Sequence, residues 1–193
     1  MLENLQKYNI ILASQSPRRQ ELLKGLDIPF TVQVLDGLEE LFPEQLQEAE
    51  IALYLAELKA DAFLPQMKEN SLVITADTIV WHEGKVFGKP IDIDDAKRML
   101  QHLSGKTHEV YTGVCIRTKE KSKSFSAVSH VRFARLTEEQ IDYYLSHYKP
   151  LDKAGAYGVQ EWIGYVAVEH IDGSYFNVMG LPIQRLYKEL KQF

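Results

Sequence analysis

Hydrophobic and polar positions follow two different periods along this chain of 193 residues. Short apolar runs rich in branched residues predict strands at 8–13, 72–80, 108–117 and 125–135. Apolar residues spaced three and four apart predict helices after Pro17, after Pro43, before Gly105, after Thr137 and near the C-terminal end. Because strands and helices interleave, and a polar loop joins 108–117 to 125–135 as a hairpin, the pattern predicts an α/β fold with a mixed, twisted sheet and flanking helices.

Residues with capping chemistry mark the ends of several predicted helices. A helix N-cap needs a side-chain oxygen that accepts a backbone N–H of the first turn. Helices are therefore expected to begin at Ser16 with Pro17 in the first turn, at Asp92 or Asp94, and at Thr137 with Gln140 completing a capping box. Pro65 is expected to stop the helix that follows Pro43.

Three further segments have less regular patterns. The apolar stretches 162–171 and 175–178 are interpreted as two more strands, separated by a turn at Asp172-Gly173. The acidic segment 36–50 is interpreted as helical. Because no linker or internal repeat interrupts the chain, residues 1–193 are treated as a single domain.

Charge and cysteine content exclude several classes of protein. With 27 acidic and 22 basic residues the formal charge is −5, which argues against a general binder of polymeric nucleic acid. No apolar run reaches the roughly 18 residues of a membrane span, and residues 1–8 lack the apolar stretch of a signal peptide. Cys115 is the single cysteine, so an intrachain disulfide is impossible. We therefore expect a cytoplasmic protein with no membrane partner, and a buried, unreactive Cys115.

The segment Ser14-Gln15-Ser16-Pro17-Arg18-Arg19 joins a predicted strand to a predicted helix start. Backbone N–H groups and the helix dipole favour an anion at such a point. Arginine can bind phosphate oxygens through two parallel hydrogen bonds. The segment therefore favours a polyphosphate site, with an ordinary N-cap beside two exposed arginines as the alternative. It lacks the glycine spacing of a Walker loop.

Asp77 interrupts a run that is otherwise suited to burial, Thr75-Ala76-Asp77-Thr78-Ile79-Val80. An unpaired buried carboxylate is unfavourable by several kcal/mol, unless it meets a cation or a catalytic water. Magnesium binds carboxylates together with phosphate oxygens. Asp77 is therefore a candidate for holding such an ion or for activating water, and an aspartate at a strand end is the alternative.

Lysines and glycines add weaker candidates. Lys59 lies on the long helix beside its apolar face, and Lys89 precedes Pro90. Lys153 lies in a glycine-rich stretch that ends at Gln160. Each lysine by itself is typical of a surface position, yet together with Arg18 they offer the positive charge that a triphosphate needs. A glutamine can both donate and accept, so Gln160 can recognise the imide edge of a pyrimidine.

The histidines show no recognisable metal motif. No two of them have the spacing of a zinc-binding helix. We interpret all six as structural or exposed: His82, His102, His108, His130, His147 and His170.

Seven segments, taken in order, resemble the Maf family of nucleoside triphosphate pyrophosphatases. They are LASQSPRR from Leu12, LKA from Leu58, TADTIV from Thr75, GKP from Gly88, LSGKTHEVYTGV from Leu103, LDKAGAYGVQ from Leu151 and IDGSYFNVMGLP from Ile171. The resemblance implies an elongated, two-lobed architecture with a central cleft, similar to inosine triphosphatases, and a homodimer. It also implies hydrolysis between the α- and β-phosphates of a nucleoside triphosphate, with Mg²⁺ or Mn²⁺ as cofactor.

The same resemblance assigns roles to individual residues. Asp77 would be the proton acceptor and a metal ligand, and Glu39 in GLEE would be a second metal carboxylate. The polyphosphate would be bound by Ser14, Arg18, Arg19, Lys59 and Lys89.

The branch of the family that acts on dTTP and UTP carries residues that match Arg18, Thr78 and Gln160. This favours dTTP, UTP and modified pyrimidine nucleotides as substrates. The alternatives are a pyrophosphatase specific for 7-methyl-GTP, a phosphatase releasing orthophosphate, and a nucleotide-binding regulator of cell division with little catalysis.

Overall fold

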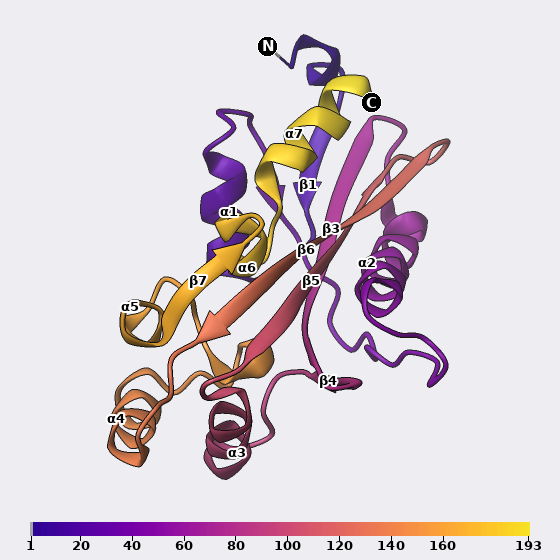
Figure 1. Cartoon of the computed structure of the whole chain (residues 1–193). Coiled ribbons are helices and arrows are strands. Elements are labelled where there is room, and N and C mark those ends of the chain that lie inside the picture. Colours follow the sequence, from indigo (N-terminus) through magenta and orange to yellow (C-terminus); the bar gives the residue numbers. More distant parts are fainter. Residues whose placement is uncertain (1) are drawn as a thin grey trace. The chain divides into compact units, whose positions relative to one another are not determined.

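The computed structural model describes residues 2–193, whose strands form one mixed, seven-stranded sheet (Figure 1). The strands are β1 Asn9–Leu12, β2 Thr31–Val32, β3 Ser71–His82, β4 Lys85–Phe87, β5 Thr107–Arg117, β6 Ser122–Phe133 and β7 Val168–Asp172. Their hydrogen-bonded order is β2-β1-β3-β5-β6-β7, with β4 paired to β3. β1 runs parallel to β2 and β3, whereas β4 and β7 are antiparallel to their partners. The predicted α/β class and mixed sheet are therefore confirmed.

Helices follow the predicted capping residues closely. They are α1 Pro17–Lys24, α2 Ala49–Phe63, α3 Ile93–Leu103, α4 Glu138–Tyr148, α5 Trp162–Ala167, α6 Tyr175–Met179 and α7 Ile183–Gln192, with short 3₁₀ turns at Glu3–Leu5, Leu64–Gln66 and Ala154–Ala156. Ser16 caps α1, Asp92 caps α3, and Thr137 with Gln140 forms a complete capping box on α4. No helix within residues 2–193 is long and apolar enough to cross a membrane.

The structure corrects three predictions. Residues 162–167 are helical rather than extended, because Ile163 and Ala167, four apart, are both fully buried while Tyr165 between them is exposed. Residues 175–179 also form a helix instead of a strand. The acidic segment 36–48 contains no helix, and α2 begins only at Ala49.

The chain divides into two compact units. Unit 1 contains the residues up to Asp77 together with Thr112–Ala127 and Gly180–Phe193. In this unit α2 packs against β5, where Ala56 and Ala60 contact the fully buried Cys115. Gly113 permits this approach, because a Cβ atom there would lie 2.2 Å from the carbonyl oxygen of Ala52. The buried location predicted for Cys115 is confirmed.

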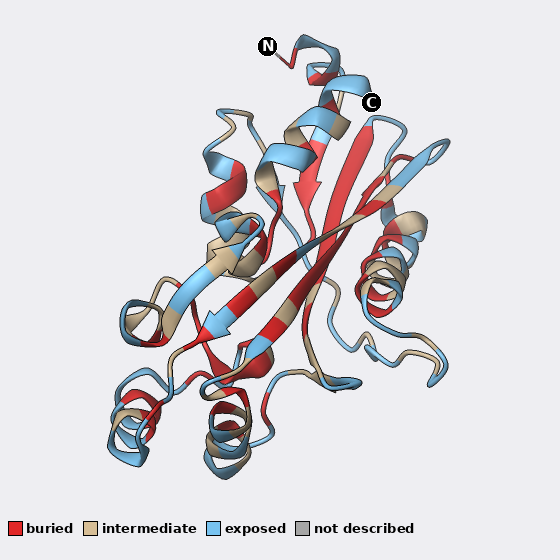
Figure 2. Ribbon diagram, viewed as in Figure 1, coloured by how far each residue is buried: buried red, intermediate tan, exposed pale blue. Residues whose placement is uncertain are grey.

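Unit 2 contains Thr78–Tyr111 and Val128–Met179. Its core is built from the inward faces of α3, α4 and α5 against the sheet, and Figure 2 shows the corresponding buried stripes on these helices. Fully buried members include Leu100, Phe133, Tyr144 and Ile163. The backbone of Gly155 has φ +67°, and a side chain there would collide with Val80. Glycine is therefore required at this turn for two reasons.

Candidate functional site

The loop between β1 and α1 is held in place by its own polar groups. The Ser16 hydroxyl oxygen accepts the backbone N–H of Arg19 at 3.5 Å, and the Ser14 hydroxyl oxygen accepts the backbone N–H of Ser16 at 3.2 Å. The side-chain amide of Gln20 donates to the carbonyl oxygens of Ser14 and Gln15. Ser14 is buried. The loop is thus a fixed helix start in unit 1, as the sequence predicts, with the dipole that favours an anion.

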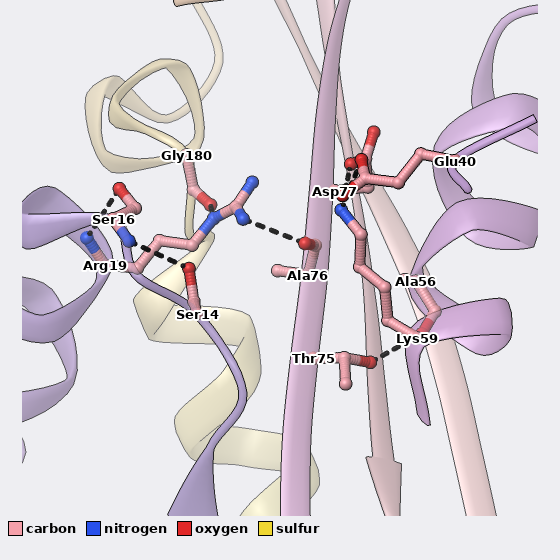
Figure 3. A network of polar contacts seen from close by, with 10 residues as sticks. All are labelled: Ser14, Ser16, Arg19, Glu40, Ala56, Lys59, Thr75, Ala76, Asp77 and Gly180. Carbon is pink, nitrogen blue, oxygen red and sulfur yellow. Dashed lines mark hydrogen bonds and ion pairs between the residues drawn. The ribbon is translucent and has the colours of Figure 1, made fainter. Parts of the chain in front are cut away.

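Arg19 joins this helix start to β3. β1 ends early, and its last hydrogen bond to β3 runs from the Ala13 N–H to the Ile74 carbonyl at 2.9 Å. The Ala76 carbonyl further along β3 accepts instead from Arg19 Nη1 at 2.8 Å, while Arg19 Nε donates to the Gly180 carbonyl at 2.7 Å (Figure 3). Two guanidinium donors are therefore committed to backbone carbonyls, which fixes α1 beside β3.

The electrostatic surroundings of Arg19 connect this helix start with the acidic group described next. Burial lowers the pKa of the Arg19 guanidinium; the negative charges of Asp77 and Glu40 oppose this shift, and the positive charge of Arg18 adds to it. Both predicted arginines and the predicted carboxylate are therefore electrostatically coupled within unit 1. Whether Arg18 and Arg19 bind phosphate stays a prediction.

Asp77 forms a compact charged group with Lys59 and Glu40 (Figure 3). Lys59 Nζ lies 2.6 Å from Asp77 Oδ1 and 2.9 Å from Glu40 Oε2. The side chains of Asp77 and Lys59 are only 12% and 15% exposed, whereas that of Glu40 is 44% exposed. Two carboxylates thus converge on one ammonium group, and the trio has a formal charge of −1.

The helix α2 places Lys59 at this point. Ala56 and Ala60 are fully buried, so the turn that contains Lys59 is pressed against the sheet. The Thr75 hydroxyl donates to the Ala56 carbonyl at 2.6 Å, which couples α2 to β3 two residues before Asp77. The predicted position of Lys59, beside the apolar face of the helix, is confirmed.

Glu40 was not singled out from the sequence. The family resemblance indicated its neighbour Glu39, whose side chain is exposed, but Glu40 is the residue whose carboxylate reaches Lys59. No periodic pattern marks Glu40, because residues 36–48 lack regular secondary structure. The adjacent pair of glutamates was the only local signal for it.

The donor set of this group fits a hard divalent cation. Mg²⁺ and Mn²⁺ bind carboxylate oxygens together with phosphate oxygens and water. The Asp77 and Glu40 carboxylates already approach one positive charge from two chain segments. The residue types and convergence of Asp77 and Glu40 thus fit such an ion, and the presence of one stays a prediction.

The remaining predicted site residues belong to unit 2. Thr78 directly follows Asp77 on β3 and is half-buried, and Lys89 is exposed just after Gly88, whose carbonyl accepts the N–H of Gly155 at 3.1 Å. The Gln160 side-chain oxygen is buried and has no hydrogen-bond partner among residues 2–193. A buried acceptor of this kind is unfavourable unless a donor reaches it.

The positive charge of Lys153 is neutralised by two neighbouring carboxylates. Its Nζ lies 2.7 Å from Asp152 Oδ1 and 3.1 Å from Glu161 Oε1. The Glu161 carboxylate also accepts from the Tyr144 hydroxyl, whose oxygen in turn accepts the backbone N–H of Gly158. Lys153 is buried, so the surface position expected of each lysine taken alone is wrong for this residue, which instead holds its loop together through these two ion pairs.

Comparison with known proteins finds relatives that are similar over the full length of the chain. A dTTP/UTP pyrophosphatase of Phocaeicola vulgatus is 60% identical over 192 residues, covering 100% of both chains. Proteins of the same name from Bacteroides fragilis and Porphyromonas gingivalis are 58% and 52% identical, covering 100% of this chain and 100% and 98% of their own.

The fold and the family are shown by two further matches. The solved structure of the Staphylococcus aureus Ham1 protein superposes with a TM-score of 0.51, at 17% identity, over 94% of this chain and 99% of that one. The model of the Maf-like protein family matches residues 9–193. The chain belongs to the Maf-like protein family.

Proposed function

We propose that this protein hydrolyses dTTP and UTP between the α- and β-phosphates, releasing the nucleoside monophosphate and pyrophosphate. The observation that carries the proposal is the convergence of Asp77, Lys59 and Glu40 beside the helix start that Arg19 holds against β3. The names of relatives more than 50% identical over the full chain support the substrate. Modified pyrimidine triphosphates are included, since the same imide edge is available in many of them.

Asp77 is proposed to accept a proton from the attacking water. Its carboxylate is buried, and Lys59 at 2.6 Å fixes its orientation. A positioned general base contributes roughly 10²- to 10⁴-fold to a rate. As the water attacks the α-phosphorus, its proton passes to Asp77 and the bond to the β-phosphate oxygen breaks, so that pyrophosphate leaves.

The positive groups bind the triphosphate and stabilise charge on its oxygens. Lys59 lies beside Asp77, and Arg18 lies on the first turn of α1, where the helix dipole also favours an anion. Ser14 and Lys89 are further proposed contacts. Arg19, with two donors committed to carbonyls, contributes by positioning α1 as well as by its charge. Most of the acceleration arises from positioning and electrostatics.

We further propose that Asp77 and Glu40 hold Mg²⁺ or Mn²⁺. When bound, such an ion neutralises the oxygens around the α-phosphate and favours the leaving of pyrophosphate. Glu40 takes this role in preference to Glu39, because its carboxylate is the one that points at the same ammonium group as Asp77.

Gln160 is proposed to recognise the base. Its unpartnered side-chain oxygen can accept the ring N–H of a uracil or thymine, and its amide can donate to a ring carbonyl. Thr78 and Arg18 are the other proposed specificity residues. A cytoplasmic location and a homodimer, both expected from the resemblance, complete the proposal; size-exclusion chromatography with light scattering tests the dimer.

A product assay with a panel of nucleotides tests the activity. We expect wild-type protein with Mg²⁺ to convert dTTP and UTP to monophosphate and pyrophosphate, faster than 7-methyl-GTP. Asp77→Asn should lose at least about 100-fold in turnover with a much smaller loss of nucleotide binding. Asp61→Asn is the matched control, because Asp61 also lies in unit 1, on α2, and its exposed carboxylate is paired with Arg117 instead of with Lys59.

Each alternative has its own signature in this assay. Orthophosphate as the only inorganic product would indicate a phosphatase, and faster turnover of 7-methyl-GTP would reassign the substrate. Tight nucleotide binding without turnover would indicate a regulator. Full activity in Asp77→Asn would remove Asp77 from the chemistry.

A further inference from the structure

A second group of metal-ligand side chains lies in unit 2, outside the residues assigned above. His82 ends β3, Glu83 is the first residue of the β3–β4 turn, and His102 lies in the last turn of α3. One ligand atom from each of these three residues lies within 4.8 Å of the others. His82 Nε2 is 3.4 Å from Glu83 Oε1, and His102 Nε2 is 3.3 Å from Glu83 Oε2.

Neither of the two histidine contacts with Glu83 is a hydrogen bond. The Nε2 atoms of His82 and His102 are both buried, and neither has a hydrogen-bond partner within residues 2–193. The two rings meet edge to face, with centroids 5.3 Å apart, and Phe87 stacks on His102 at 5.1 Å. Packing therefore holds two buried imidazole nitrogens toward one carboxylate without satisfying them, which is unfavourable in the absence of a ligand.

The tautomer of His82 suits metal binding. Its imidazole hydrogen-bonds the backbone of Thr107, and because Nε2 has no such partner, the bond runs through Nδ1. A ligating histidine usually donates its second ring N–H to a carbonyl or carboxylate, which directs the lone pair of the other nitrogen toward the metal.

Glutamate is an unfavourable residue at position 83 in the β3–β4 turn. β3 and β4 pair at His82 and Lys85, so the turn consists of Glu83 and Gly84, with φ +50° and +74°. Two-residue hairpins of this kind favour Asn-Gly or Asp-Gly, because both central residues need positive φ. Glutamate has no such local advantage there, and its longer side chain is what reaches between the two histidines.

We propose that His82, Glu83 and His102 form a binding site for a divalent transition-metal ion, best matched by Zn²⁺, that ties the β3–β4 hairpin to α3. Zn²⁺ binds imidazole nitrogen and carboxylate oxygen at about 2.0–2.2 Å, which places tetrahedral ligand atoms about 3.4 Å apart. The observed separations of 3.4 and 3.3 Å match this spacing. Three protein ligands leave one tetrahedral position, and because Glu83 is exposed, water can take it.

This site differs in chemistry from the Asp77 group. Two nitrogens and one carboxylate favour zinc-like ions, whereas carboxylates alone favour Mg²⁺. Its failure would therefore leave the proposed hydrolysis untouched. The residue that opposes metal binding is Lys106, whose Nζ lies 3.5 Å from Glu83 Oε1 and repels a dication.

Calorimetric titration of the full-length, chelator-treated protein with Zn²⁺ in excess Mg²⁺ tests the site. We expect one Zn²⁺ per chain, retained in Asp77→Asn and weakened at least about tenfold in His82→Gln and His102→Gln. His130→Gln is the matched control, because His130 belongs to the same unit and faces Glu109 at 3.2 Å without a third ligand. Co²⁺ in place of Zn²⁺ should give a visible absorption spectrum that is lost in the same two variants.

Lys106→Gln provides a test with the opposite sign, because a variant that fails to fold would bind Zn²⁺ less tightly. Removing the positive charge beside Glu83 should tighten Zn²⁺ binding severalfold while all three ligands remain. Zn²⁺ should also raise the melting temperature of wild type and His130→Gln but not that of His102→Gln. Unchanged Zn²⁺ affinity in either ligand variant, weaker binding in Lys106→Gln, or no binding by wild type would each overturn the proposal.

Discussion

Replacing Lys59 by methionine would leave the Asp77 carboxylate buried without its counter-charge. The side chains of Asp77 and Lys59 are 12% and 15% exposed, and their charged atoms are 2.6 Å apart. Removing one partner of a buried pair destabilises by about 3–5 kcal/mol, because the remaining charge is desolvated and unpaired. Since some exposure remains, we expect about 3 kcal/mol, which lowers the melting temperature by about 6–12 °C in a domain of this size.

Two companion variants separate this effect from lost packing. Glu40→Gln should lower the free energy of unfolding by at most about 1 kcal/mol, because the Glu40 side chain is 44% exposed and water screens its contact with Lys59. Lys59→Met combined with Asp77→Asn should recover most of the loss, because no buried charge is then left unpaired.

Urea denaturation monitored by fluorescence and by far-UV circular dichroism measures these changes, and agreement of the two probes checks that unfolding is two-state. If Asp77 and Glu40 hold Mg²⁺, adding Mg²⁺ should stabilise Lys59→Met more than wild type, because the ion replaces the missing positive charge. A Lys59→Met protein within about 0.5 kcal/mol of wild type, and indifferent to Mg²⁺, would refute the argument about this charged group.

Three other predictions concern packing, pH and base choice. Gly113→Ala should destabilise by about 1–3 kcal/mol in urea, because its Cβ would lie 2.2 Å from the Ala52 carbonyl oxygen and α2 must shift; no loss would contradict the close approach. Burial lowers the pKa of His108 to about 3 from its ordinary 6.5, so the neutral ring favours the folded state. This stabilisation of the folded state is complete above pH 6.5. Between pH 6.5 and 3 the free energy of unfolding falls by about 1.4 kcal/mol for each pH unit that the solution is acidified. His108→Phe should flatten this slope of the unfolding free energy, and an unchanged slope would count against it. Gln160→Leu should lower kcat/KM for UTP about threefold to tenfold, the value of one hydrogen bond, and an unaltered ratio of UTP to 7-methyl-GTP turnover would exclude Gln160 from base recognition.

Local interactions explain why much of the fold was predictable from the sequence. A cap such as Thr137 with Gln140 involves residues three apart, and the apolar period of β3 is set by its own side chains, so both are visible without tertiary information. The prediction for residues 162–167 was wrong because it used only these local interactions. That apolar run suits a strand as well as a buried helix, and only its packing partners decided between them.

The candidate site was predictable where a single segment carries the chemistry. Asp77 in an apolar strand and two arginines after Ser16 are each recognisable alone. The commitment of Arg19 to the carbonyls of Ala76 and Gly180 was not, because it depends on where β1 stops pairing with β3.

By itself the sequence determined the central strands, the helices that begin at a capping residue, and the presence of arginine-containing and acidic segments, because these depend on neighbours within one or two turns. Only the tertiary structure decided that Glu40, and not Glu39, meets Lys59, and that His102 comes to lie against His82 across twenty residues. The reason is geometric. A one-residue step along an irregular segment reverses where a side chain points, and the distance between two residues far apart in sequence is set by the packing of everything between them.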